Sequence, residues 1–422
     1  MDTSLANRYR GRQQELMQQM GEGLALIQAG GVTQDALLHD KNVLYLTGLS
    51  APDAVLLLAP GGIKVDYFET MHTAEVGRGR MVHTILFVNE RTAAQVFIDG
   101  PADNLEAVQQ AAGVDRVLGL DKLNETLHRN LMRQSVLWLN TPATPRLDKP
   151  LTPQLFFSNQ LRERYYWLSC RNIAPLIHKM RYVKDAYEIN CLRQAFSVQT
   201  EIFTQIMSTL RPGTNESLGQ AIFEYEVRTR PQHISVGLDM YDSSIIVGAG
   251  KNAVIGHYMA NNQEILDGDL VLIDAGISYH GYYSDITSTF PANGSFTPRQ
   301  RELYAIVLEA QKQAIATMRP GVTEYEVHQA VYAVFQAHGL EKESYGRCGH
   351  SVGLNIHDVY EYPDPPLVPG VVVVIEPFLM LPNEGIGIRL ECGVLITANG
   401  PEILPHPPQE IEAVEAVCRR TA

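Results

Sequence analysis

The sequence is poor in cysteine and in long apolar runs. Its five cysteines are an odd number, lie far apart and form no CxxC pair, which argues against a disulfide framework and a thiolate zinc site. No 18 apolar residues run together, and the first 20 residues lack the apolar core of a signal peptide. These absences predict a soluble, cytoplasmic protein with reduced thiols.

Basic residues are also scarce. The 422 residues include 47 Asp and Glu against 34 Lys and Arg, a formal net charge of −13. Binding to nucleic acid without regard to its sequence needs a basic stripe, so we expect neither nucleic acid nor an anionic membrane as a partner. With 45% hydrophobic and 19% charged residues, the composition is that of a globular chain, and the length suggests two or three domains.

The first part of the chain alternates short apolar runs with helical patterns. These predict strands at 44–48, 54–59, 85–88 and 95–98, and helices at 104–112 and 123–132. Such alternation is typical of an α/β domain, which we expect at residues 1–172. No cluster of ligands or nucleophiles stands out in it. A second domain is expected at 173–422.

A unit of helix, Arg-Pro-Gly and helix occurs twice in this second domain. Long helices are predicted over 184–210 and 297–318, and each ends in Arg-Pro-Gly before another helix begins. The second tripeptide comes 108 positions after the first. A repeated tripeptide alone could arise by chance, so a true repeat should extend into the strands beyond each copy.

Matched acidic residues lie beyond both copies. Asp274 and Glu376 each end an apolar strand, six residues past a glycine, and each is succeeded by a second acid, Asp285 and Glu391. The repetition predicts one domain of two halves, with two acidic pairs facing each other across a pseudo-twofold axis.

Carboxylates at these positions point to metal binding. One strand-end acid could face solvent or cap a neighbouring helix, but several in apolar strands need pairing or a metal. Gly276 and Gly281 suit a hairpin that brings Asp274 and Asp285 side by side. Carboxylates crowded together need a counter-charge, which a pair of divalent cations would supply. An oxygen-rich set with one imidazole favours Mn, Co, Fe or Zn.

Six segments of the second domain resemble the pita-bread metallopeptidases, which include Xaa-Pro aminopeptidase (aminopeptidase P), prolidase and methionine aminopeptidase. The segments are 246–258 (IVGAGKNAVIGHY), 267–276 (DGDLVLIDAG), 281–291 (GYYSDITSTFP), 349–359 (GHSVGLNIHDV), 371–380 (VVVVIEPFLM) and 385–397 (GIGIRLECGVLIT). Segments 42–58 and 177–189 resemble the aminopeptidase P and prolidase branch and extend the likeness over most of the chain. Methionine aminopeptidase lacks such an N-terminal domain. The resemblance implies an α/β N-terminal domain followed by an α+β pita-bread domain with an internal pseudo-twofold repeat.

The resemblance also implies the ligands and the nucleophile. Two divalent ions per chain, Mn first and Co, Zn or Fe as alternatives, would be bridged by Asp285 and Glu391. Asp274 would chelate one metal, and His350 with Glu376 would hold the other. A bridging water or hydroxide would be the nucleophile, so no Ser or Cys nucleophile is needed.

Further residues acquire roles in the same way. Glu376 resembles the carboxylate that orients and deprotonates the water, and His257 and His357 match the family's substrate-contacting histidines. Without the family, His257 would read as a surface histidine. Arg389 matches an arginine near the metals that could bond a ligand carboxylate or the substrate.

Two departures from the family affect substrate binding. The stretch 358–374 lacks the arginine common in relatives, for which Tyr360 and Tyr362 could stand in, and Cys392 lies where relatives commonly have Asp. Neither change removes a ligand, but both leave the preferred peptide length open.

The predicted function is an Xaa-Pro aminopeptidase acting on proline-containing peptides, with an Xaa-Pro dipeptidase (prolidase) as the alternative. An X–Pro amide is tertiary, so a dedicated enzyme is expected. The fold also occurs in a metal-free amidinohydrolase, a sulfonium-compound lyase and binding modules for peptides or histones. The complete ligand set argues against the metal-free and binding branches. By resemblance we expect a homo-oligomer, a dimer or tetramer.

Overall fold

A computed structural model describes residues 3–29, 41–51, 53–65, 81–91, 93–100, 104–140, 151, 153–230, 234–236, 245–344, 346–359 and 364–419. The chain divides into two compact units, Met1–His178 and Lys179–Ala422. Within the described residues, no helix combines the length and the apolar character needed to cross a membrane.

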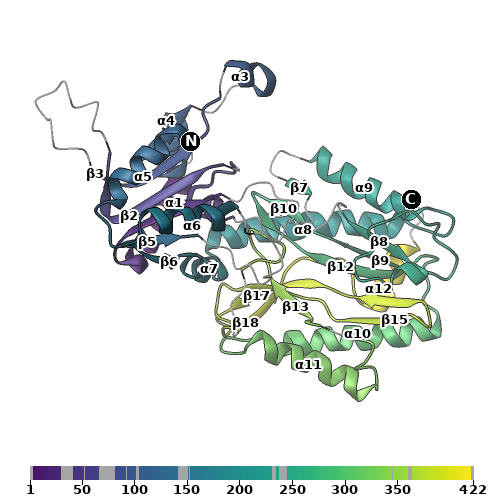
Figure 1. Ribbon diagram of the computed structural model, residues 1–422. Coiled ribbons are helices and arrows are strands. Elements are labelled where there is room, and N and C mark those ends of the chain that lie inside the picture. The colour runs from purple at the N-terminus through teal and green to yellow at the C-terminus, as the bar shows by residue number, and fades with distance from the viewer. Residues whose placement is uncertain are drawn as a thin grey trace, which may run out of the picture. The chain divides into compact units, whose positions relative to one another are not determined.

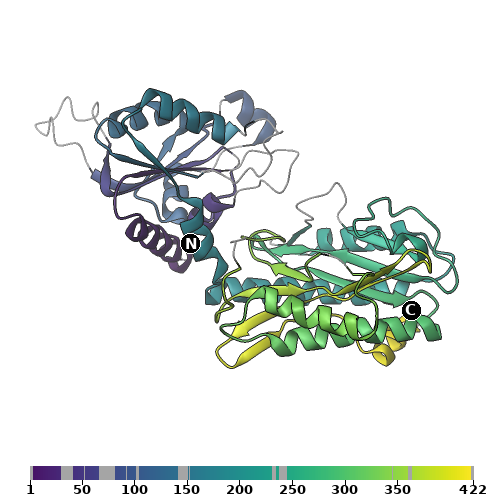
Figure 2. The ribbon, with the colours of Figure 1, turned by 60° about the horizontal axis from the view of Figure 1, so that its bottom comes forward.

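The N-terminal unit is built on a six-stranded mixed sheet with the order β4-β3-β2-β1-β5-β6. Its strands are β1 (Leu24–Gln28), β2 (Val55–Lys64), β3 (Met81–Val88), β4 (Arg116–Gly119), β5 (Val136–Leu139) and β6 (Ser169–Asn172). Its helices are α1 (Thr3–Met20), α2 (Asn42–Thr47), α3 (Ala93–Asp99), α4 (Leu105–Ala112), η2 (Leu120–Lys122), α5 (Leu123–Leu131) and α6 (Pro153–Arg164), and α7 (Ala174–Tyr182) comes next. Figure 2 shows helices on both faces of the sheet, which confirms an α/β domain.

Two of the strands predicted in this unit are wrong. Residues 44–47 belong to α2, and Gly48 is its C-cap, where φ is 71° and the N–H donates to the carbonyl of Leu44. A glycine in this left-handed conformation ends a helix without steric cost. Residues 95–98 belong to α3, and Phe97 is 91% exposed, so this apolar run does not enter the sheet. The predicted strands at 54–59 and 85–88 and both predicted helices are confirmed.

The second unit is a pair of similar halves. The first comprises α8 (Ala186–Thr209), α9 (Glu216–Thr229), β7 (Ile234–Val236), β8 (Ile246–Ala249), η3 (Gly250–Asn252), β9 (Leu270–Ala275), β10 (Ile277–Tyr279), β11 (Tyr282–Tyr283) and β12 (Ile286–Pro291). The second comprises α10 (Pro298–Thr317), α11 (Glu324–Ala337), β13 (Gly349–Ser351), β14 (Val372–Ile375), β15 (Phe378–Leu381), β16 (Ile386–Arg389), β17 (Cys392–Thr397), β18 (Gly400–Ile403) and α12 (Ile411–Cys418). In Figure 1 the helices of the first half, α8 and α9, are teal, and those of the second half, α10 and α11, are green and lie next to each other at the bottom of the view.

The repeat extends to strand order and to single hydrogen bonds. Strands β8, β9 and β12 form an antiparallel sheet, and β13, β14 and β17 pair in the same way. After the first Arg-Pro, the N–H of Gly213 donates to Ile265 over 2.9 Å; after the second, that of Gly321 donates to Leu367 over 2.8 Å. The matched bonds confirm that one construction is used twice.

Side-chain caps fix where the paired helices begin. An Asn side chain caps α9, and a capping box begins each of the other three helices. In a capping box, the side chain of the capping residue accepts a hydrogen bond from the backbone N–H three residues later. The Glu or Gln side chain at that later position accepts one from the backbone N–H of the capping residue. The capping residues are Asp185 for α8, Asn215 for α9, Thr297 for α10 and Thr323 for α11. Asp185 and Thr297 lie within one residue of the starts predicted for the two long helices, 184 and 297.

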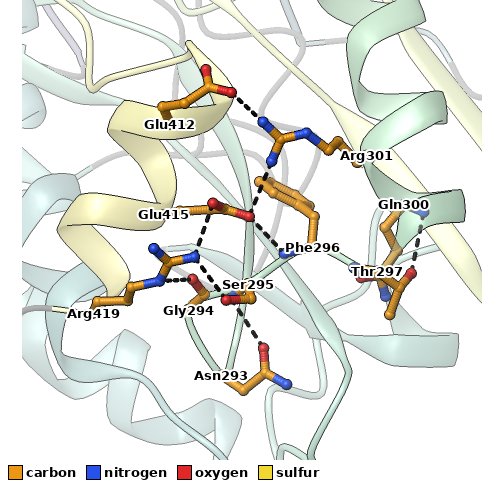
Figure 3. A network of polar contacts seen from close by, with 10 residues as sticks. All are labelled: Asn293, Gly294, Ser295, Phe296, Thr297, Gln300, Arg301, Glu412, Glu415 and Arg419. Carbon is orange, nitrogen blue, oxygen red and sulfur yellow. Dashed lines mark hydrogen bonds and ion pairs between the residues drawn. The ribbon is translucent and has the colours of Figure 1, made fainter.

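The C-terminal helix α12 is attached by polar contacts to the turn between β12 and α10 (Figure 3). Glu415 accepts from the N–H of Phe296 at 3.1 Å and from Arg301 at 3.3 Å. Arg419 donates to the carbonyl of Gly294 at 2.9 Å and to the hydroxyl of Ser295 at 2.8 Å. These contacts secure the turn that leads from the end of β12 into α10.

Candidate metal centre

The two acids of the first half lie at the same end of one strand pair. Asp274 is in β9, opposite Thr287 of β12, and Asp285 comes directly before β12. The predicted hairpin therefore does bring Asp274 and Asp285 together. The short strands β10 and β11 fill the connection, and His280 takes a φ of 50° at their turn.

The second half repeats this arrangement and adds a histidine. Glu376 comes directly after β14, and its N–H donates to the carbonyl of Cys348 at 2.9 Å. His350 is the middle residue of β13. Glu391 lies between β16 and β17, and its N–H donates to Thr287 of the first half at 3.0 Å. This last contact joins the two halves next to the acids.

The five predicted ligands form one cluster. Three overlapping groups each bring three possible ligand atoms within 4.8 Å of one another: Asp274, Asp285 and Glu391; His350, Glu376 and Glu391; and Asp285, His350 and His357. His350 Nε2 lies 3.5 Å from Asp285 and 3.8 Å from Glu376. Every predicted ligand belongs to at least one group.

The charge in the cluster is not compensated by the protein alone. Burial, followed by the negative charges of Asp274 and Glu376, raises the pKa of Asp285 well above its ordinary range. Burial and then Asp285 do the same to the pKa of Glu391. Asp285 Oδ1 and Glu391 Oε1 are buried and have no hydrogen-bond partner. Such orphaned oxygens are costly, and hard divalent cations are the partners that suit them, so the donor set fits metal ions.

Arg389 is a cation that contacts the cluster, and it is held on three sides. Its guanidinium bonds the carboxylate of Asp274, Nε donates to the hydroxyl of Thr287 at 3.1 Å, and Nη1 donates to the carbonyl of Gly256 at 3.3 Å. The side chain is only 7% exposed. Thr287 in turn donates to Glu391 at 2.8 Å. Arg389 thus bonds a candidate ligand directly.

The two other predicted histidines border the cluster. The rings of His350 and His357 lie 4.0 Å apart, edge to face. Desolvation, then His350 and His257, lowers the pKa of His357 to about 3. Desolvation, followed by the charge of Arg389, lowers the pKa of His257. Both imidazoles are therefore neutral near pH 7, and their ring N–H groups can donate to a substrate.

Buried glutamines from the long helices support the strand ends, and the sequence reasoning missed them. Gln199 of α8 donates to the carbonyl of Ala275, next to Asp274. Gln311 of α10 donates to the carbonyl of Leu390, next to Glu391, at 3.1 Å. A polar residue in the apolar stripe of an amphipathic helix was the available signal.

Glu216 is a further residue that was missed. It is fully buried at the start of α9 and accepts four hydrogen bonds, from the N–H groups of Ala249 and Gln263 and the side chains of Asn252 and Tyr258, at 2.8 to 3.0 Å. These donors span the segment 249–263, which carries His257. One carboxylate therefore closes this segment into a defined loop.

The structure describes one of the two positions at which the sequence departs from the family. Tyr360 and Tyr362 lie outside the described residues. Cys392 is buried, and burial, then the charge of Glu391, raises the pKa of its thiol to about 12. This thiol stays protonated beside the carboxylates.

Fold and site together define a class. Residues 190–398 match the metallopeptidase family M24, and residues 9–138 match the aminopeptidase P N-terminal domain. The structure is therefore that of a two-domain pita-bread metallopeptidase, and the family and the ligand cluster together imply metal ions.

Individual relatives narrow the class. The Xaa-Pro aminopeptidase of Escherichia coli K12 is 31% identical, with 97% of each chain covered. The structure of proline aminopeptidase P II from Yersinia pestis, 31% identical, superposes with a TM-score of 0.79 over 98% of this chain and 99% of that chain. An Xaa-Pro dipeptidase of Pyrococcus horikoshii is 30% identical over 60% of this chain and 71% of its own. The chain belongs to the aminopeptidase P family of M24 metallopeptidases.

Proposed function

We propose that this enzyme holds two divalent metal ions and removes the N-terminal residue that precedes proline in peptides longer than two residues. The observation that carries the proposal is the pair of orphaned oxygens on Asp285 and Glu391, in the middle of a five-ligand cluster. Full-length similarity to Xaa-Pro aminopeptidases supports the substrate class.

The five predicted ligands would hold the two metal ions in different ways. Asp285 and Glu391 would bridge the two ions, Asp274 would chelate one, and His350 with Glu376 would hold the other. We propose manganese as the native metal, with Co, Zn or Fe as alternatives. When bound, the ions supply positive charge that polarises the scissile carbonyl and lowers the pKa of a nucleophilic water.

The protein's own groups would handle orientation and protons. Glu376 is the most exposed of the carboxylates, with 23% of its side chain accessible, so its free oxygen can orient a water and accept its proton. His257 and His357 would donate to the substrate carbonyl as it becomes an oxyanion. Arg389 would keep Asp274 in its ligating orientation.

Steady-state hydrolysis of Gly-Pro against an Xaa-Pro-Pro tripeptide tests the proposal. The metal-loaded enzyme should cleave the tripeptide with the higher kcat/KM and release its first residue. Cleavage of the dipeptide alone would contradict the proposed aminopeptidase activity and would indicate an Xaa-Pro dipeptidase. No hydrolysis of either peptide with Mn, Co and Zn supplied would favour a non-peptidase member of the fold.

The location, the oligomeric state and the domain limits are further proposals. We propose a cytoplasmic location, a homo-oligomer (dimer or tetramer) and domain limits at 1–172 and 173–422. Size-exclusion chromatography with light scattering tests the second, and expression of residues 173–422 alone tests the third.

A further inference from the structure

A buried cluster of three charged side chains lies outside the predicted ligand set. Arg181, at the end of α7, bonds Asp358 Oδ1 at 2.5 Å, and Lys184 Nζ lies 3.5 Å from Asp358 Oδ2. No side chain of the three is more than 5% exposed. Burial opposes the charged form of Asp358, but the charges of Arg181 and Lys184 outweigh it and lower its pKa.

The cluster holds the segment that links two histidines of the site. Asp358 comes directly after His357, and the segment begins at His350 in β13. Lys184 Nζ also donates to the hydroxyl of Ser351, next to His350, at 3.2 Å. The start and the end of the segment are thus bonded to the same ammonium.

The middle and the backbone of the segment are held as well. Arg181 Nη2 donates to the side-chain carbonyl of Asn355 at 2.8 Å. The N–H of Asp358 donates to the carbonyl of Ser351 at 2.9 Å, which closes the segment into a loop. A Cβ on Gly353 would come within 2.1 Å of Asp358 Oδ2, so the loop packs directly against the carboxylate. The loop therefore has little freedom while the cluster is intact.

Stability alone does not explain such a cluster. Burying charged groups costs desolvation energy, and apolar residues of similar volume often stabilise a fold equally well. The polar contacts of Arg181 and Lys184 instead fix the position of the loop that carries His350 and His357, because each contact ends on one particular atom of that loop. Outer residues of this kind set the orientation of the groups that meet metal and substrate.

We propose that Arg181, Lys184 and Asp358 are positioning residues that fix the loop 350–358 and thereby aim the His357 ring at the substrate. The inference rests on the proposed substrate contact of His357. It predicts that the cluster acts on turnover through His357 rather than through overall stability.

A double-mutant cycle on the metal-loaded enzyme tests this coupling. Lys184→Met removes the ammonium and keeps the Arg181–Asp358 pair. We expect kcat for an Xaa-Pro-Pro peptide to fall about 10- to 100-fold, with KM changed by less than about 3-fold. In a His357→Ala background the same change should lower kcat by less than about 2-fold. An equal fall in both backgrounds, or an unchanged kcat in Lys184→Met, overturns the proposal.

Arg193→Gln is the matched control. Arg193 pairs with Glu402 at 2.7 Å in the same unit, but both side chains are more than 40% exposed. Loss of this pair should leave kcat within about 2-fold of the wild type. If Lys184→Met does not fold, Ser351→Ala removes only the hydroxyl that accepts from Lys184, and it should lower kcat several-fold by the same route.

Hydrogen exchange gives a readout that does not depend on activity. In Lys184→Met, or in Ser351→Ala, the amides of 351–358 should exchange at least about 10-fold faster than in the wild type, while those of α10 stay unchanged. Unchanged exchange in the loop contradicts the proposal even if the wild type cleaves no Xaa-Pro peptide. Faster exchange together with an inactive wild type would instead refute the proposed function.

Discussion

Asp285 Oδ1 and Glu391 Oε1 are the two buried oxygens on which the proposed metal binding rests. Both lie buried among like charges without a hydrogen-bond partner. A protein that never bound metal would gain stability by replacing either residue with a neutral one. The two carboxylates therefore destabilise the fold unless a positive charge, such as that of a bound cation, offsets theirs.

Glu391→Gln tests this view, because the amide keeps the shape and removes one negative charge. Without metal, the variant should be more stable than the wild type, on the order of 1 kcal/mol, since one repulsive charge is gone. With metal, the order should reverse and activity should fall at least about 100-fold, because the variant lacks a carboxylate that we propose as a bridging ligand. Thermal melts with and without chelator measure both effects. A variant that is less stable in both states would contradict the crowding argument.

Thr287→Val tests the hydroxyl that joins Glu391 and Arg389. The change keeps the β-branched shape and removes both hydrogen bonds. We expect about 10- to 100-fold weaker metal binding or activity, and a loss of about 1–3 kcal/mol in the free energy of unfolding. Thr397→Val is the control, because it also removes a hydroxyl that makes two hydrogen bonds, one donated to the carbonyl of Gly400 and one accepted from the N–H of Asn399, but at the β17–β18 turn. It should leave metal affinity unchanged.

At the scale of elements, the catalytic unit was more predictable than the N-terminal one. Long helices that end at the two copies of Arg-Pro-Gly carry strong local signals, and α8 and α10 match the predicted ranges 184–210 and 297–318 closely. Residues 44–48 and 95–98 are short apolar runs, in which helix and strand look alike. The first of these runs forms a helix that ends at the left-handed Gly48, and the second forms an exposed helix outside the sheet.

Some residues of the site could also be predicted from the sequence, and others could not. The carboxylates could be found because each stands at a strand end in a repeated frame. Glu216, Thr287 and the cluster at Lys184 could not, since their partners are more than 30 positions away in sequence and only folding brings them together. The predicted metal ligands follow a spacing pattern in the sequence, whereas the residues that hold those ligands in place follow none.

Glu216 provides a prediction at this scale, because one side chain shapes the segment 249–263. Glu216→Gln loses acceptor capacity and places an NH₂ against buried donors. We expect a loss of about 2–4 kcal/mol in the free energy of unfolding and a lower kcat, since the His257 loop loosens. Tyr258→Phe removes one of the four bonds and should cost about 1 kcal/mol. Urea unfolding of both variants checks the ranking, and equal losses would contradict it.

At the scale of the whole molecule, the acidic net charge of −13 takes on a different meaning. Four of the protein's carboxylates gather in one cluster beside the buried Arg389, and two divalent ions would neutralise their charge. The pseudo-twofold repeat makes this possible, because each half contributes two acids from equivalent strand ends. Duplication of one scaffold thus produces a site that neither half could form alone.

The most direct test is metal titration of the chelator-treated protein, with bound ions counted by mass spectrometry and hydrolysis of an Xaa-Pro-Pro peptide measured in the same samples. We expect activity to rise with added Mn²⁺ and to reach its maximum at two bound ions per chain, and we expect Asp285→Ala and Glu391→Ala to remain folded and inactive. Binding of fewer than about one ion per chain, or turnover retained in either variant, would contradict it.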